Sequence, residues 1–111
     1  MIARALIALS LILGFLGGAG VAANRSDVAD AVMKRDKDAV RSLLRQKADV
    51  NAAQIDGATA IHWAVYNDDV DTADLLIRAG ANVRVANRNR ITPLAMACLY
   101  GNAAMIDRLL K

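Results

Sequence analysis

Two side chains in this sequence invite a chemical role by type alone: His62 is the only histidine and Cys98 is the only cysteine. A zinc site needs three or four protein ligands, and neither residue has the histidine or cysteine partners that would complete one. A single cysteine also excludes an internal disulfide framework. We therefore expect no metal site, no cofactor and no disulfide.

Acidic residues gather in one short segment, where residues 67–71 read Asn-Asp-Asp-Val-Asp. A calcium loop alternates its ligands and needs a glycine and a closing glutamate, which this segment lacks. Aspartate is also one of the favoured residues at the start of a helix, where its carboxylate accepts backbone N–H groups. Capping of a following helix therefore explains these aspartates better than calcium does.

Catalytic serine chemistry is not indicated either. The serines are Ser10, Ser26 and Ser42, and none stands in a pattern typical of a nucleophile with a base and an orienting acid. Nucleic acid is not indicated, because the 14 basic residues less Arg4 exceed the 11 acidic ones by only two. The sequence therefore predicts a protein that is not an enzyme and binds no nucleic acid.

The elements that would position any binding residue come as a repeat with a period of 33 residues. Each copy predicts a turn, a short helix, a tight corner and a second helix. One such unit cannot bury its own apolar faces, so successive units must stack. The positions that recur at this interval are Val28, Ile61 and Leu94; Ala31, Ala64 and Ala97; Leu43, Leu76 and Leu109; and Thr59 with Thr92.

This pattern resembles the ankyrin repeat over about residues 23 to 111. The family signature Asp-Gly-x-Thr-Pro-Leu-His-x-Ala and its later Leu-Leu-x-x-x-Gly-Ala are matched by Asp56, Gly57, Thr59, Ile61, His62, Ala64, Leu75, Leu76, Gly80 and Ala81. Thr92 and Pro93 open the next copy, and Gly101 fills its corner. The chain departs from the family at Ala60 for proline, Asp68 for glycine and Ala95 for histidine. The resemblance implies that Thr59 and His62 form one structural hydrogen-bonded pair.

The same resemblance implies an all-α solenoid of about three helix-turn-helix units with short hairpin-like loops. We expect a capping repeat over residues 24–55, a full repeat over 56–88 and a truncated repeat over 89–111. Lys111 falls two residues before the expected Gly-Ala closure. We therefore expect the N-terminal portion of a longer array, with further ankyrin repeats on the C-terminal side.

Residues 1–23 have the build of a secretory signal peptide. Arg4 gives a positive start, residues 5–16 are mostly apolar, and residues 17–23 are small throughout, which suits cleavage after Ala23. The expected location is then outside the cytoplasm, in the periplasm or secreted if the host is bacterial. A retained anchor formed by residues 5–23 is the alternative, and contact with a membrane is expected only in that case.

The family resemblance also implies where a partner would bind, because inner helices and turn tips of ankyrin proteins line a concave groove. Ala60, Trp63 and Asn67 form a stripe beside the core stripe of the second copy, and Pro93, Met96 and Tyr100 repeat it. Because Trp, Tyr and Arg dominate binding hot spots, we expect the groove to use Trp63, Asn67, Arg88, Arg90, Met96 and Tyr100. Packing between repeats is the alternative role for Trp63, and a solvated loop is the alternative for the arginines.

We further expect Cys98 to be a small buried residue, and Ile106, Leu109 and Leu110 to face inward. The predicted function is a non-enzymatic module that binds an unidentified protein. Two alternatives stay open: the docking arm of a larger enzyme whose catalytic domain lies beyond residue 111, and a membrane-tethered scaffold with an uncleaved leader.

Overall fold

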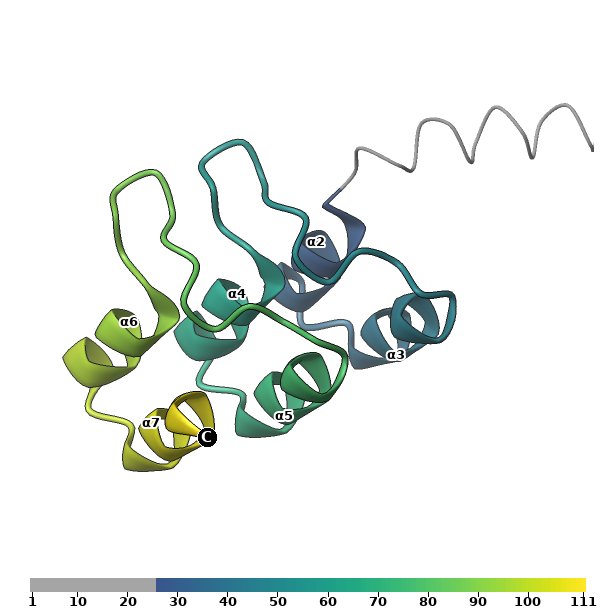
Figure 1. Ribbon diagram of the computed structural model, residues 1–111. Coiled ribbons are helices and arrows are strands. Elements are labelled where there is room, and N and C mark those ends of the chain that lie inside the picture. The colour runs from purple at the N-terminus through teal and green to yellow at the C-terminus, as the bar shows by residue number, and fades with distance from the viewer. Residues whose placement is uncertain (1–25) are drawn as a thin grey trace, which may run out of the picture.

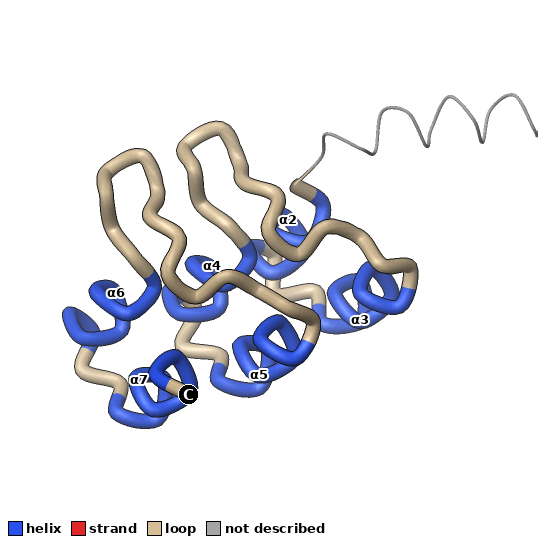
Figure 2. Tube along the Cα trace, in the orientation of Figure 1, coloured by secondary structure: helices blue, strands red, loops and turns tan. Residues whose placement is uncertain are grey.

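The computed structural model describes residues 26–111, and the leader predicted for residues 1–23 lies outside them. The described part is helical, without strands (Figure 2). Its helices are α2 (Asp27–Met33), α3 (Lys37–Arg45), α4 (Ala60–Tyr66), α5 (Val70–Arg78), α6 (Pro93–Tyr100) and α7 (Ala103–Leu110). The prediction of an all-α solenoid of helix-turn-helix units is therefore confirmed.

The helices lie in two rows (Figure 1). Helices α2, α4 and α6 form the inner row, and α3, α5 and α7 form the outer row. Consecutive pairs make repeat one (α2, α3), repeat two (α4, α5) and repeat three (α6, α7). Helix α4 packs against both α2 and α6, so it is central to the stack. We call the contact between repeats one and two the first junction, and that between repeats two and three the second junction.

The long loops before α4 and α6 each fold into a hairpin that projects beyond the inner row (Figure 1). In the first hairpin the Gln54 N–H donates to the Ala58 carbonyl over 2.8 Å. In the second hairpin the Asn87 N–H donates to the Ile91 carbonyl over 3.0 Å. Both hairpins therefore close in the same way, at positions 33 residues apart.

The core lies between the two rows. Ile61 and Ala64 on α4 and Leu76 on α5 are at most 1% exposed, as their spacing predicted. The small residues Ala64 and Ala97 occupy the same position in consecutive inner helices, and both are fully buried. Since a methyl group leaves room for close packing, this position lets the helices of the inner row lie side by side.

Side chains cap the outer row at one recurring position. Asp36, Asp69 and Asn102 accept hydrogen bonds from the backbone N–H three residues later, at the starts of α3, α5 and α7. This arrangement confirms that the acidic segment 67–71 serves as a helix start. The residue before each cap has a positive φ, and it is Arg35, Asp68 or Gly101. Glycine is favoured in this left-handed conformation, but in repeats one and two Arg35 and Asp68 adopt it although they carry side chains.

Two of the inward-facing predictions for repeat three are wrong. Leu110 is 67% exposed, because the buried face of α7 is formed by Met105 and Leu109, which lie four residues apart on one side of the helix. Cys98 is exposed as well. Its equivalent Val65 is buried and belongs to a repeat that has another packed after it.

Candidate functional site

Three aromatic rings lie in sequence along the inner row, and we call them the aromatic row: Trp63, Tyr66 and Tyr100. The rings of Trp63 and Tyr66 meet edge to face, with centroids 5.4 Å apart and planes at 84°. Tyr66 then meets Tyr100 across the second junction, with centroids 6.3 Å apart. Tyr66 is 57% exposed and Tyr100 is 54% exposed. Exposed aromatic rings at this density are characteristic of binding surfaces.

Tyr66 was missed by the sequence analysis, although a signal for it existed. It follows Trp63 by three residues on a predicted helix, and residues at that spacing lie on neighbouring parts of one face. The repeat position of Tyr66 is taken by Met33 in repeat one and Leu99 in repeat three, and both are also exposed. This position therefore presents a large side chain to solvent in every repeat.

A cavity of about 240 Å³ opens beside Trp63, between the inner row and the hairpins. It brings Trp63 of repeat two together with Met96 of repeat three, two residues that the sequence analysis assigned to a common groove. The first hairpin contributes Asp56 and Ala58, and the full lining is Asp56, Ala58, His62, Trp63, Tyr66, Asn87 and Met96. The cavity therefore exists only where repeats two and three are packed together.

Trp63 is held in place by a chain of side-chain hydrogen bonds. Its Nε1–H donates to Oε1 of Gln54 over 2.7 Å, and Nε2 of Gln54 donates to Oδ1 of Asp30 over 2.7 Å. The indole N–H is partly buried, and this bond satisfies it and fixes the ring orientation. Trp63 therefore packs against the core, as one of the two interpretations expected, and it also lines the cavity.

The polar residues assigned to the groove are used partly inside the protein. The Nδ2 atom of Asn67 donates to the Val32 carbonyl over 2.9 Å and so ties α4 to the end of α2. Arg88 donates from Nη2 to the Ile55 carbonyl over 2.7 Å and connects the two hairpins. Arg90 is exposed and lies in the second hairpin with a positive φ of 63°.

Both ring nitrogens of His62 form hydrogen bonds, one within its own repeat and one to the second hairpin. The Thr59 N–H donates to Nδ1 of His62 over 3.1 Å, so Nδ1 carries no proton. The Nε2–H therefore donates to the Ile91 carbonyl in the second hairpin, 3.0 Å away. The predicted pairing of Thr59 with His62 is confirmed. Between residues 26 and 111, no group of three histidine, cysteine or acidic side chains is placed to hold a metal ion.

Gly57 allows the two hairpins to lie against each other. The Arg88 N–H donates to the Asp56 carbonyl over 2.8 Å. A Cβ atom on Gly57 would lie 2.8 Å from the Arg88 nitrogen and 3.2 Å from the Asn87 Cα. Its φ of 83° is also disfavoured for residues with a side chain. The hairpins therefore require glycine at this position.

A family model described as ankyrin repeats in three copies matches residues 28–111. The chain belongs to the ankyrin repeat family. Ankyrin repeats serve in general as protein-protein interaction modules, and the arrangement of inner helices and hairpins found here is theirs.

Curated relatives contain this ankyrin region within much longer proteins. The chain is 32% identical over 84 residues to the tyrosine-protein kinase HTK16 of Hydra vulgaris, covering 73% of this chain and 11% of that protein. It is 36% identical over 72 residues to the potassium channel AKT1 of Oryza sativa, covering 65% and 8%. It is 40% identical over 72 residues to the protein PhlB of Serratia liquefaciens, covering 64% and 32%. The chain thus spans a third or less of each of these proteins.

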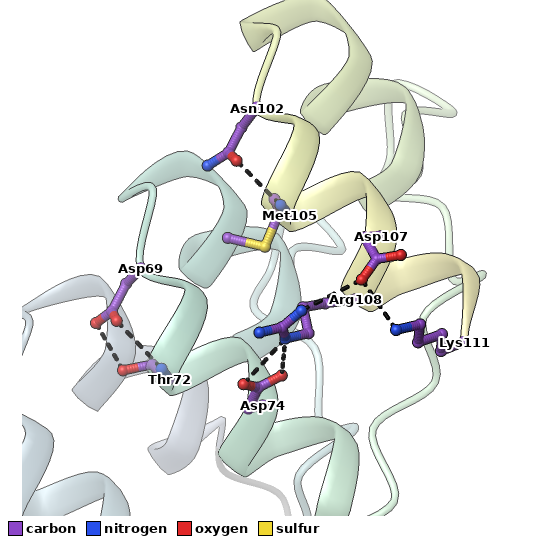
Figure 3. A network of polar contacts seen from close by, with 8 residues as sticks. All are labelled: Asp69, Thr72, Asp74, Asn102, Met105, Asp107, Arg108 and Lys111. Atoms are coloured by element: carbon purple, nitrogen blue, oxygen red, sulfur yellow. Dashed lines mark hydrogen bonds and ion pairs between the residues drawn. The ribbon is translucent and has the colours of Figure 1, made fainter.

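The outer helices of the ankyrin repeats are joined by a polar network (Figure 3). Arg108 on α7 pairs with Asp74 on α5, with Nε and Oδ1 2.9 Å apart, and this contact raises the pKa of the Arg108 guanidinium. Lys111 pairs with Asp107 on the same helix.

Within residues 26–111, none of the helices has both the length and the apolar character that crossing a membrane requires.

Asp69 joins repeats one and two at the start of α5. Its carboxylate accepts hydrogen bonds from the N–H and Oγ1–H of Thr72 and lies 3.7 Å from Nζ of Lys37. Partial burial raises the pKa of Asp69, but the hydrogen bonds from Thr72 and the charge of Lys37 together lower this pKa by more than burial raises it. The pKa of this carboxyl therefore lies below its ordinary value of 3.8.

Proposed function

We propose that this protein is a non-enzymatic binding module that holds a protein partner against its inner row and hairpins. The observation that carries the proposal is the aromatic row, whose two tyrosines are more than half exposed to solvent near the Trp63 cavity. Tryptophan and tyrosine provide large contact areas and dominate measured hot spots. We assign Trp63, Tyr66, Met96 and Tyr100 as the anchors of this surface.

The mechanism is display of a preformed surface. Trp63 is fixed by Gln54, and the hairpins are fixed to each other by Arg88. A surface that is already ordered loses little conformational entropy on binding, so more of the contact energy appears as affinity. Asn67 and Arg88 contribute by holding the repeats in register, while Arg90 remains available to a partner at the rim.

A photo-crosslinking amino acid placed at position 66 or 100 of the full-length protein tests this assignment in its own host. We expect the same partner to be crosslinked from both positions, and not from position 45, which lies exposed on α3 in the outer row. Replacing Tyr66 and Tyr100 together by alanine should then weaken binding of that partner by about 30-fold or more. Equal crosslinking from the outer row, or unchanged affinity, would contradict the proposal.

We also propose that the module is exported and that its leader is removed, on the evidence of the charge and apolar pattern of residues 1–23. N-terminal sequencing of the mature protein should begin at Asn24. Recovery of a protein that still begins at Met1 and fractionates with membranes would favour the tethered scaffold instead.

A second candidate function is the docking arm of a larger enzyme. The similarity to the kinase HTK16 favours it, because in that protein the matching region is only 11% of the chain. Further ankyrin repeats after residue 111 would fit either function. Reading the coding sequence downstream of codon 111 separates them: a catalytic domain supports the docking arm, and further repeats with a stop codon support the binding module.

A further inference from the structure

A second cleft lies on the same inner face, at the second junction. Its volume is about 590 Å³, and it is lined by Tyr66, Asp68, Tyr100, Gly101 and Asn102. The two rings come from different repeats and stand at 66° to each other, with centroids 6.3 Å apart. The cleft therefore has two aromatic walls that are exposed to solvent, and a polar floor at the corner between helices.

The charge of this cleft is negative. Asp68 is exposed, and one carboxylate oxygen, Oδ1, accepts a hydrogen bond from Nδ2 of Asn102. Among residues 26–111, Asp68 takes part in no ion pair, whereas its neighbour Asp69 is paired with Lys37. The carboxylate at the cleft thus keeps a charge that the described part of the chain does not neutralise.

Aromatic walls beside an uncompensated carboxylate favour one class of ligand group. The face of a tyrosine ring carries partial negative charge and attracts cations, which prefer it to water when the contact excludes solvent. An acidic group would be repelled by Asp68, and a purely apolar group would gain nothing from it. A guanidinium group also stacks flat on aromatic rings while its N–H groups reach a carboxylate.

We propose that this cleft binds a positively charged side chain, arginine or lysine, of the protein partner. The proposal rests on the proposed function, because it takes the inner face to be the docking surface. It adds what the partner must present: a basic side chain that lies over the Tyr66–Tyr100 ring pair and reaches Asp68, next to the part of the partner that covers the Trp63 cavity.

Blocked single amino acids test the cleft without knowledge of the partner. Nuclear magnetic resonance titration of the isotope-labelled protein with the N-acetyl methylamide of arginine should shift the ring signals of Tyr66 and Tyr100 and the amide signal of Gly101. The corresponding derivative of lysine should shift the same signals. The derivative of citrulline has nearly the shape of arginine without the charge, and it should bind about two- to fivefold more weakly.

Asp68→Asn is the decisive variant. Asparagine tolerates the left-handed conformation of this residue and still accepts the bond from Asn102, so the fold should be kept while the charge is lost. We expect the affinity for the arginine derivative to fall about two- to fivefold and its salt dependence to disappear. The matched control is Asp71→Asn, an exposed aspartate in the first turn of α5 outside the cleft lining, which should change neither.

The outcomes separate this inference from the proposed function. If citrulline binds as well as arginine, or if Asp68→Asn leaves the affinity unchanged, the cation site is wrong even where the crosslinked partner still needs the aromatic row. If the arginine derivative binds at the cleft but the partner does not need Tyr66 and Tyr100, the proposed docking surface is wrong instead.

Discussion

The two junctions of this ankyrin stack use the same repeat positions in different ways. At the first junction Asn67 donates to the Val32 carbonyl and is half-buried. At the second junction the equivalent residue is Tyr100, which contacts Tyr66 and leaves half of its ring in solvent. The hairpin side differs too, because His62 bonds to Ile91 at the second junction, whereas its equivalent in repeat one is Ala29.

This difference shows that equivalent positions of one repeat can either bond to the neighbouring repeat or stay exposed to solvent. At the first junction, the polar side chain of Asn67 on the inner face bonds to the neighbouring repeat. At the second junction the hairpins, His62, the Asn102–Asp68 bond and the Arg108–Asp74 pair hold the repeats together, and the side chains of Tyr66 and Tyr100 stay more than half exposed. We therefore expect the binding surface at the second junction, where the two hairpins contact each other. The following substitutions test this difference between the two junctions.

Gly57→Ala should have the largest effect. The added Cβ meets the Arg88 backbone at 2.8 Å and demands a disfavoured φ, so we expect a loss of about 3 kcal/mol in the free energy of unfolding, measured by urea denaturation. The control is Gly80→Ala, where φ is 94° but nothing lies within 4 Å, and the loss should be about 1 kcal/mol. Equal losses would mean that the contact between the hairpins is not tight.

His62→Ala should weaken the second junction by about 2 kcal/mol, because it leaves a buried N–H of Thr59 and the Ile91 carbonyl without their partner. Hydrogen exchange should then show faster opening of α6 and α7 than of α2 and α3. Uniform loss of protection across all repeats would indicate that His62 stabilises its own helix rather than the junction.

Asn67→Ala should destabilise the protein by about 1 kcal/mol, since the bond to Val32 across the first junction is lost. The complementary change is Tyr100→Asn, which gives the second junction the residue of the first. Its thermal stability should change little, while the affinity for the partner falls. A Tyr100→Asn protein that keeps full affinity would remove the distinction between the junctions.

Asp69→Asn should have the smallest effect. Because the folded-state pKa of Asp69 is lower than its ordinary value of 3.8, the ionised carboxylate stabilises the fold above that pH, and the contribution is lost as the pH falls through the folded-state pKa. We expect the variant to be about 0.5 kcal/mol less stable at about pH 6 and equal to the wild type at about pH 2. A difference that persists in acid would indicate lost packing rather than lost charge.

Much of the fold could be predicted from the sequence because the repeat period fixes helix positions. Thr92 and Pro93, which the motif places at the opening of a copy, do begin α6, and Gly101 does end it. Burial was harder to predict, because it depends on which neighbour covers each residue. Cys98 shares its repeat position with the buried Val65, but nothing in the described chain packs against that side of it.

The site was predicted less completely. Trp63 and Met96 do share a cavity, but Tyr66 was missed because it lies outside the two stripes that were compared, which contain Trp63 and Met96. Asn67 and Arg88 look like exposed polar residues in the sequence. Their partners Val32 and Ile55 lie more than 30 residues away, so only the assembled stack reveals that their donors are already used.

The position of Tyr66 and Tyr100 on separate repeats has a thermodynamic consequence. Stacked repeats unfold through loss of nearest-neighbour contacts, so the second junction can open while the first stays closed. A partner that contacts both rings binds only when this junction is intact. Its binding therefore stabilises the contact between repeats two and three. Unfolding of the complex should therefore be more cooperative than that of the protein alone, because the second junction no longer opens separately from the first.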